Sequence, residues 1–312
     1  MARTLRFLHR PGAVVEITQR TLQGRYLLRP SQQANDLIVG CLARARQKNP
    51  GVRLHAVSVM SNHLHMLASF ETAEVMASFM CHLKTNLSKE LGRLHDWPGS
   101  LWHGRYHSVP VSDEPAAQIS RLRYLLSQGV KEGLVMAPED WPGVHPAKPL
   151  RTGKAMKGRW IHRTRMHAAR LRGEVVREAD FTTPEEVQLE PIPALESADL
   201  QSFQSEIARL LEDIEKESLA RHRAEGTAPA GVQMIFSIDP QHRPRKLARS
   251  PKPLFHAATR RVREALTEGF REFVVAYRVA AEKLAGGDRS AEFPEGSFPP
   301  RLPFVSPAFA GR

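Results

Sequence analysis

The chain has 312 residues, a length that predicts two domains or one domain with a long appendage. Lysine and arginine number 45 against 33 acidic residues, and the net charge of +12 favours a polyanionic partner, nucleic acid before an anionic membrane surface. Only two cysteines occur, Cys41 and Cys81, which excludes a disulfide framework and a cysteine-rich zinc module. No apolar run approaches the roughly 20 residues of a membrane span, and the first residues lack the apolar stretch of a secretion signal, so we expect a cytoplasmic protein without a membrane partner.

Alternating and helical patterns of apolar residues predict one folded unit over residues 1–145. Its expected elements, in chain order, are a strand over 13–20, a helix capped by Ser31 and ending near 47, strands over 52–60 and 63–70, a helix capped by Thr72 and ending near 94, a strand over 101–111 and a helix over 114–127. This order predicts an α+β fold, a ferredoxin-like or RRM-like antiparallel sheet with helices on one face.

The densest positive charge follows this unit, in a basic arm and linker expected over residues 146–195. Between 151 and 180 the chain has nine basic and three acidic residues. Such a stretch binds phosphates without regard to base sequence, so we expect an arm that contacts DNA, although a solvated linker helix has the same composition. A second basic cluster, expected as an extended loop among prolines, consists of Arg243, Arg245, Lys246, Arg249 and Lys252.

Residues 196–312 are expected to form a mainly helical C-terminal extension of unknown role. One long helix is predicted from the cap Ser197 to about residue 225, and a second from Phe255 to about Leu284. The Gly- and Pro-rich segment from Gly286 is expected to be a flexible tail.

Residues 60–67, with the sequence Met-Ser-Asn-His-Leu-His-Met-Leu, contain the first candidate for chemistry. Alternate residues of a strand share a face, so His63 and His65 project together while Leu64 and Met66 point to the packed face. Two adjacent imidazoles can chelate one divalent metal. A pair of surface or cross-strand histidines is the simpler interpretation of this spacing alone.

The second candidate lies in the last predicted helix of the unit. Tyr124 and Gln128 are four residues apart and therefore share one helix face. A tyrosine hydroxyl can attack a phosphodiester when a metal polarises the phosphate, and the Gln128 amide oxygen is a possible third metal ligand. A half-buried aromatic residue on a helix is the alternative for Tyr124.

Four segments of the unit occur in the order of a known family. Residues 60–67 resemble its MPNHVHLL element, residues 101–107 (LWHGRYH) its FWQRRY segment, and residues 124–135 (YLLSQGVKEGLV) its YIxxNPVxxGLV element. The family is the HUH single-tyrosine transposases. The opening Met-Ala-Arg together with residues 11–14 is similar to the start of the REP-associated tyrosine transposases (RAYT) within that class.

The resemblance implies the HUH nuclease fold and a metal-dependent single-stranded DNA endonuclease and strand transferase that acts at hairpins or palindromic repeats. His63, His65 and Gln128 match the ligands of Mg²⁺ or Mn²⁺. Tyr124 matches the nucleophile, which would form a 5′-phosphotyrosine and free a 3′-hydroxyl, so that rejoining needs no nucleotide cofactor. Relatives are monomers or homodimers, and both states stay open for this chain.

The sequence departs from the family pattern at three places. Gln128-Gly129 stands where the family has Asn-Pro, Ser61 replaces a proline, and Glu16 occupies a strand position often held by histidine. A domesticated protein that binds DNA or RNA hairpins without cutting them is therefore the alternative function. A replication-initiator or relaxase-like HUH nuclease is a third interpretation.

Residues expected to contact nucleic acid combine aromatic base platforms with cations. Packing on the sheet is the alternative for Trp102, and Tyr106 is the second candidate nucleophile. The expected contacts are Trp102, Arg105, Tyr106, Lys84, Arg121, Arg123, Lys154, Lys157, Arg159, Arg163 and Arg165.

Overall fold

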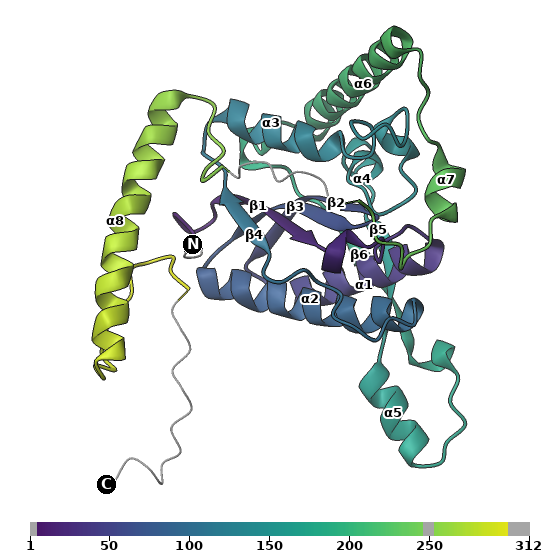
Figure 1. Cartoon of the computed structure of the whole chain (residues 1–312), viewed down its shortest axis with the longest axis horizontal. Coiled ribbons are helices and arrows are strands. Elements are labelled where there is room, and N and C mark those ends of the chain that lie inside the picture. Colours follow the sequence, from purple (N-terminus) through teal and green to yellow (C-terminus); the bar gives the residue numbers. More distant parts are fainter. Residues whose placement is uncertain (1–4, 246–252, 299–312) are drawn as a thin grey trace.

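A computed structural model describes residues 5–245 and 253–298. At its centre is a four-stranded antiparallel sheet with the strand order β2-β3-β1-β4. The strands are β1 (Val14–Arg20), β2 (Val52–Met60), β3 (His63–Phe70) and β4 (His107–Pro110). Two helices, α1 (Gln32–Gln47) and α2 (Ala73–Leu94), lie together over one face of this sheet (Figure 1).

Local sequence signals explain where these helices begin. The Ser31 hydroxyl accepts a hydrogen bond from the Ala34 amide at 3.1 Å, and the Thr72 hydroxyl accepts one from the Val75 amide at 3.2 Å. Each cap satisfies one of the amides that a helix leaves unpaired at its start. Both predicted caps, both helices and the α+β class are confirmed.

The alternation along β3 determines what each sheet face contacts. Phe70 points toward α2, where its ring lies 5.9 Å from that of Phe79. His65 points to the opposite face, where its ring lies 5.5 Å from that of Tyr124 on helix α3 (Pro115–Leu126). The helix predicted over 114–127 is therefore present as α3, and it crosses the face opposite α1 and α2 (Figure 1).

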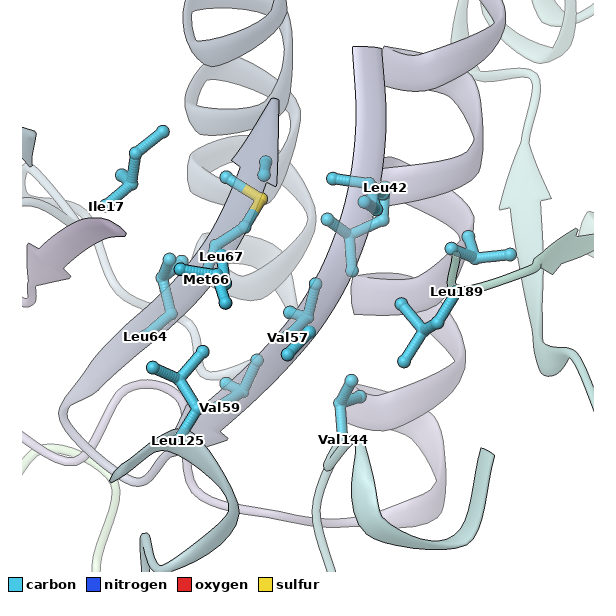
Figure 2. Packing of buried hydrophobic residues seen from close by; sticks show 14 of the residues in the cluster. Ile17, Leu42, Val57, Val59, Leu64, Met66, Leu67, Leu125, Val144 and Leu189 are labelled. Atoms are coloured by element: carbon cyan, nitrogen blue, oxygen red, sulfur yellow. The ribbon is translucent and has the colours of Figure 1, made fainter. Parts of the chain in front are cut away.

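Apolar residues of α3 explain this placement. Leu122, Leu125 and Leu126 are buried. Figure 2 shows Leu125 among side chains of β2 and β3, with Val144 and Leu189 from later segments close to the same core. The sheet therefore has packed residues on both faces.

The strand predicted over 101–111 is shorter than expected. Only His107–Pro110 pairs with β1, while Trp102 makes an isolated bridge to Thr21. Gly104 between them has a φ of 91°, a conformation that favours glycine and turns the chain out of the strand direction.

The segment expected as an arm and linker is largely docked on α1. It comprises α4 (Ala147–Thr152), β5 (Met156–Ile161), α5 (Arg163–Leu171) and β6 (Thr182–Val187), and β5 and β6 form an antiparallel pair. A Cβ on Gly40 of α1 would lie 1.9 Å from the Arg159 carbonyl oxygen, so the glycine permits this close approach. Only α5 and the loop after it project from the body (Figure 1).

The C-terminal extension is helical, as predicted, with α6 (Leu200–Glu225), α7 (Val232–Ser237) and α8 (Arg260–Ala285). The cap of α6 is Asp199 rather than Ser197, because the Asp199 carboxylate accepts the Ser202 amide at 2.9 Å. Helix α8 begins five residues later than predicted, since the chain before it is extended and His256 bridges to Val111 at the sheet edge. Short 3-10 turns occur at Leu22–Gly24, Pro138–Asp140, Glu178–Phe181 and Pro193–Leu195.

One hydrophobic cluster extends from Leu8 to Ile235 and so crosses both expected domain boundaries. A smaller cluster joins Phe255, Phe270 and Phe273 to the N-terminal Phe7. The division into 1–145, 146–195 and 196–312 stays a prediction, and apolar contacts connect all three parts. Among the described residues, no helix has the length and apolar character needed to cross a lipid bilayer.

Two sequence predictions fall partly outside the described residues. Of the second basic cluster, only Arg243 and Arg245 are described. The tail after Gly286 is described as far as Phe298, and there the Gly296 carbonyl accepts the Leu8 amide at 2.9 Å. Its last 14 residues, 299–312, lie outside the described part.

Candidate active site on the polar face of the sheet

The polar face of β3 brings the two predicted histidines together. The rings of His63 and His65 have centroids 5.0 Å apart and are nearly perpendicular, at 84°. The strand register places His65 opposite Thr18 of β1 and Ser58 of β2. The predicted common orientation of the two imidazoles is therefore present in the structure.

Each imidazole has one nitrogen occupied by a neighbouring oxygen. His65 Nδ1 lies 3.2 Å from Glu16 Oε1 and 3.2 Å from Thr18 Oγ1, and His63 Nδ1 lies 2.7 Å from Asn62 Oδ1. A carboxylate or amide oxygen accepts, so the proton belongs on Nδ1 of each ring. Each ring then has its lone pair on Nε2, the arrangement that metal-binding histidines require.

Glu16 is the buried carboxylate that organises this face. It is 5% exposed, and its Oε2 accepts from Arg121 Nε at 2.8 Å and from His256 Nε2 at 3.0 Å, while Oε1 faces His65. Burial opposes ionisation, but the hydrogen bonds from His256 and His65 and the charge of Arg121 outweigh it and lower the pKa of Glu16. The carboxylate is therefore an anion at neutral pH.

Tyr124 lies beside this arrangement on α3. Its ring is 5.5 Å from that of His65 in an edge-to-face arrangement. The Arg121 guanidinium lies 4.1 Å from the Tyr124 ring centroid and the Lys131 ammonium 3.7 Å, both favourable cation–π contacts. The tyrosine thus meets the histidines of its own chain and is flanked by two positive charges.

Gln128 completes the group, one helical turn after Tyr124. Its Nε2 donates to the Tyr124 carbonyl at 3.0 Å, which fixes the amide plane and turns Oε1 inward. Oε1 is buried without a hydrogen-bond partner of ordinary geometry, although the side chain lies near enough to His63 to affect its ionisation. A buried amide oxygen left in this state fits a metal ligand, because such oxygens are otherwise costly.

The protonation state of His63 agrees with a metal role. Burial lowers the pKa of His63 well below its ordinary value, and the positive charges of Arg20 and Lys131 act in the same direction. The ring is therefore neutral, the form that binds metals. Within residues 5–245 and 253–298 no cluster of three or more His, Cys, Asp or Glu side chains has metal-binding geometry. Two imidazole nitrogens and the Gln128 amide oxygen nevertheless fit a divalent cation.

The aromatic residues predicted to stack on bases are buried. Trp102 is 8% exposed and donates its indole N–H to the Lys84 carbonyl at 3.0 Å. Tyr106 is 6% exposed, burial raises the pKa of its hydroxyl, and Arg6 covers its ring at 4.4 Å. Base stacking on these two rings stays a prediction that requires them to become exposed. Arg105 between them is exposed.

Several of the predicted DNA-contacting cations are paired with carboxylates. Arg163 binds Glu90 at 2.7 Å and Glu178 at 2.8 Å, and Arg123 binds Glu217 at 2.6 Å. Weaker pairs join Arg159 to Asp36 and Lys157 to Glu186, while Lys84 donates to the Gly104 carbonyl. Lys154 and Arg165 are exposed and make no ion pair with other described residues, so these two are the freest of the set.

Sequence reasoning missed His256. It lies 240 residues after Glu16, with no motif around it, and only the pairing of residues 255–257 with the edge of β4 brings it to the site. A cavity of about 670 Å³ lies between α3 and residues 253–258, with Arg121 and His256 among its lining residues. The C-terminal extension therefore forms part of the surroundings of this site.

The comparison with protein-family models agrees with the sequence resemblance. Residues 37–128 match the family model described as IS200-like transposase. No curated protein matches this chain. A solved REP-associated tyrosine transposase, bound to a REP hairpin, is similar at 16% identity over 49% of this chain and 87% of its own, with a TM-score of 0.41. A candidate transposase from Deinococcus radiodurans R1 is similar at 21% identity over 39% of this chain and 95% of its own, with a TM-score of 0.28. The similarity to IS200-like transposases covers residues 37–128, which include His63, His65, Tyr124 and Gln128.

Proposed function

We propose that this protein cuts and rejoins single-stranded DNA at hairpin-flanked sites through a covalent bond to Tyr124. The observation that supports this most directly is the position of the Tyr124 ring, 5.5 Å from the His65 ring, with His63 and Gln128 beside them. Residues from β3 and α3 thus converge on one small region of the sheet surface. The hairpin substrate follows from the sequence resemblance to REP-associated tyrosine transposases.

His63, His65 and Gln128 would hold Mg²⁺ or Mn²⁺ through two imidazole nitrogens and one amide oxygen. When bound, the cation supplies Lewis-acid polarisation of the scissile phosphate. Side chains of the protein would position the phosphate and the tyrosine. Arg121 and Lys131 flank the tyrosine ring and would attract the phosphate, while α3 holds the Tyr124 ring beside that of His65.

The proposed chemistry conserves the energy of the phosphodiester. The Tyr124 oxygen bonds to phosphorus, the bond from phosphorus to the 3′-oxygen breaks, and that oxygen takes up a proton as the tyrosine hydroxyl proton leaves to solvent. The product is a 5′-phosphotyrosine and a free 3′-hydroxyl. Attack by a 3′-hydroxyl on the phosphotyrosine reverses these steps and rejoins a strand.

A covalent-adduct assay tests this function. Labelled single-stranded hairpin DNA, taken from repeats that flank the gene, is incubated with protein and Mn²⁺ and separated on a denaturing gel. We expect a shifted band that requires metal and disappears in Tyr124→Phe, because the phenyl ring lacks the attacking oxygen. Tyr106→Phe is the matched control, since Tyr106 is a buried tyrosine outside this group, and it should retain the band.

Two results would contradict the assignment. An adduct in Tyr124→Phe that is lost in Tyr106→Phe would move the nucleophile to Tyr106. Tight binding of the hairpin by the unmodified protein with no adduct at any metal concentration would instead favour the alternative function, a hairpin-binding protein that does not cut.

A further inference from the structure

We infer that His256, which the C-terminal extension brings to the sheet, is a positioning residue that keeps the Glu16 carboxylate on His65. The inference rests on the proposed metal role of His65. It also gives a function to a part of the chain that lies outside the family match, since that match ends at residue 128.

The segment around His256 extends the sheet. The His256 amide donates to the Pro110 carbonyl at 3.0 Å, and the His256 carbonyl accepts the Ser112 amide at 2.8 Å, so the residue forms a parallel bridge with Val111. Two backbone hydrogen bonds fix its position at the end of β4. The backbone is thus held at the sheet edge, and from there the His256 imidazole reaches Glu16 Oε2 at 3.0 Å.

Neighbouring contacts hold the segment on both sides of His256. The Glu114 carboxylate accepts the Ala258 amide at 2.8 Å, the Thr259 amide at 3.1 Å and the Thr259 hydroxyl at 2.6 Å. On the other side, the buried Phe255 ring lies 5.8 Å from that of Phe7. The extension is thus anchored to the sheet by polar contacts at one end and by an aromatic cluster at the other.

The two carboxylate oxygens of Glu16 have different partners. We infer that His256 keeps one oxygen on Arg121 and the other on His65. Oε1 faces His65 Nδ1 at 3.2 Å, whereas Oε2 accepts from both His256 and Arg121. Arginine favours a bidentate pair with a carboxylate, in which both oxygens would turn to the guanidinium. The His256 N–H holds Oε2 in its present direction, so Oε1 stays available to His65.

Loss of the His256 side chain should therefore change the tautomer of His65. If the carboxylate rotates toward Arg121, His65 Nδ1 keeps only the Thr18 hydroxyl, which can donate as well as accept. The proton is then no longer fixed on Nδ1, and the Nε2 lone pair is presented for only part of the time. Partners of this kind change metal affinity by about 10- to 100-fold when they touch the ligand directly, and we expect about three- to tenfold for a residue one contact further away.

The test compares His256→Ala, His256→Gln and the matched control His242→Ala, a histidine that is exposed and stacks on Tyr26. The first measurement is the ¹⁵N imidazole spectrum of the metal-free full-length protein, which reports the His65 tautomer. The second is Mn²⁺ affinity from electron paramagnetic resonance without DNA. We expect mixed tautomers and a three- to tenfold weaker affinity in His256→Ala, substantial recovery in His256→Gln, whose amide still donates, and no change in His242→Ala.

An unchanged His65 tautomer and Mn²⁺ affinity in folded His256→Ala would overturn the inference. If the C-terminal extension no longer docks on the sheet in His256→Ala, two further variants separate the role of His256 in docking from its hydrogen bond to Glu16. These variants are His256→Gln and Glu114→Gln. The first keeps the donor to Glu16 and should retain the His65 tautomer, and a changed tautomer there would contradict the inference. The second weakens only the docking. A wild-type protein that binds no Mn²⁺ would refute the proposed metal site, while the spectrum of the metal-free protein would still decide whether His256 controls His65.

Discussion

Two buried glutamates lie in different regions of the molecule and have different kinds of partner. Glu90 on α2 is 6% exposed and binds Arg93 at 3.0 Å and Arg163 at 2.7 Å. Glu16 on β1 is 5% exposed and binds one arginine, Arg121, together with two histidines. Burial and charge are nearly the same at the two positions, so the partners distinguish them.

The partner type indicates what each carboxylate does. A guanidinium carries only hydrogen-bond donors and stays charged. The pair of Glu90 with Arg163 therefore joins α2 to α5 and presents no lone pair to a ligand. An imidazole held by a carboxylate at one nitrogen keeps a lone pair on the other. Glu90 is therefore interpreted as a structural residue, and Glu16 as a residue that prepares His65 for a ligand.

The largest expected effect is on stability at Glu90. Glu90→Gln removes the charge that two arginines share, and the less exposed of them, Arg163, keeps only Glu178 as an ionic partner. Breaking a buried ion pair costs about 3–5 kcal/mol, and we expect the lower end because Arg163 is partly exposed. Urea unfolding at pH 7.5 measures the change. A loss below about 0.5 kcal/mol, within the range of ordinary surface changes, would show that the pair is not structural.

A smaller effect in energy, but a selective one, is expected at Glu16. Glu16→Gln keeps the shape of the side chain and removes its charge, so it should weaken Mn²⁺ binding and DNA cleavage about 10- to 100-fold. Glu90→Gln is the matched control and should bind Mn²⁺ as the wild type does. Equal metal affinities in the two variants, measured by calorimetry, would remove the distinction between the two glutamates.

The third and smallest effect is a pH dependence of the free energy of unfolding. It sets the pH at which the Glu90→Gln and Glu16→Gln variants are best compared. Burial lowers the pKa of His55 to about 4 and that of His145 to about 3, whereas an unfolded histidine titrates near 6.5. Their contribution to stability is complete above pH 6.5 and is lost as the pH falls toward the folded values. At pH 6 the loss is roughly 1 kcal/mol for each histidine.

Thermal unfolding between pH 7.5 and 5 measures this loss. His145→Gln should flatten the acid slope, because glutamine does not titrate and its oxygen can accept the Ala147 amide that His145 accepts at 3.3 Å. An acid slope identical to that of the wild type would assign the loss to other groups. Glu16→Gln and Glu90→Gln should both retain the slope, so the two glutamates are best compared above pH 7.

Sequence information was sufficient where the signal is local. The alternation His63–Phe70 gave both the bounds of β3 and the face on which the two histidines lie. Ser31 and Thr72 marked the starts of α1 and α2, because a hydroxyl followed by an apolar helical period specifies a cap. The positions of Tyr124 and Gln128 one turn apart were predictable for the same reason.

Sequence information failed where distant segments meet. From the sequence, Glu16 was recognisable only as a departure from the family pattern. Its role was not predictable, because its three partners come from positions 65, 121 and 256. The docking of β5 on α1 depends on Gly40 and Gly158, two glycines whose close approach has no sequence signature. The salt bridge between Arg163 and Glu90 likewise joins distant segments and has no sequence signal, while DNA contact by this arm stays a prediction.

The pairing of the first described residues with the last has a consequence for protein synthesis. The Leu8 amide bonds the Gly296 carbonyl, Phe7 packs on Phe255, Phe270 and Phe273, and His256 bonds Glu16. On the ribosome, the N-terminal part emerges and folds first. When Tyr124 and both histidines of β3 have emerged from the ribosome, His256 and the three phenylalanines that pack on Phe7 have not yet emerged. The complete arrangement around Glu16 therefore forms only after His256 has emerged, so the site is fully assembled later in synthesis than Tyr124 and the β3 histidines.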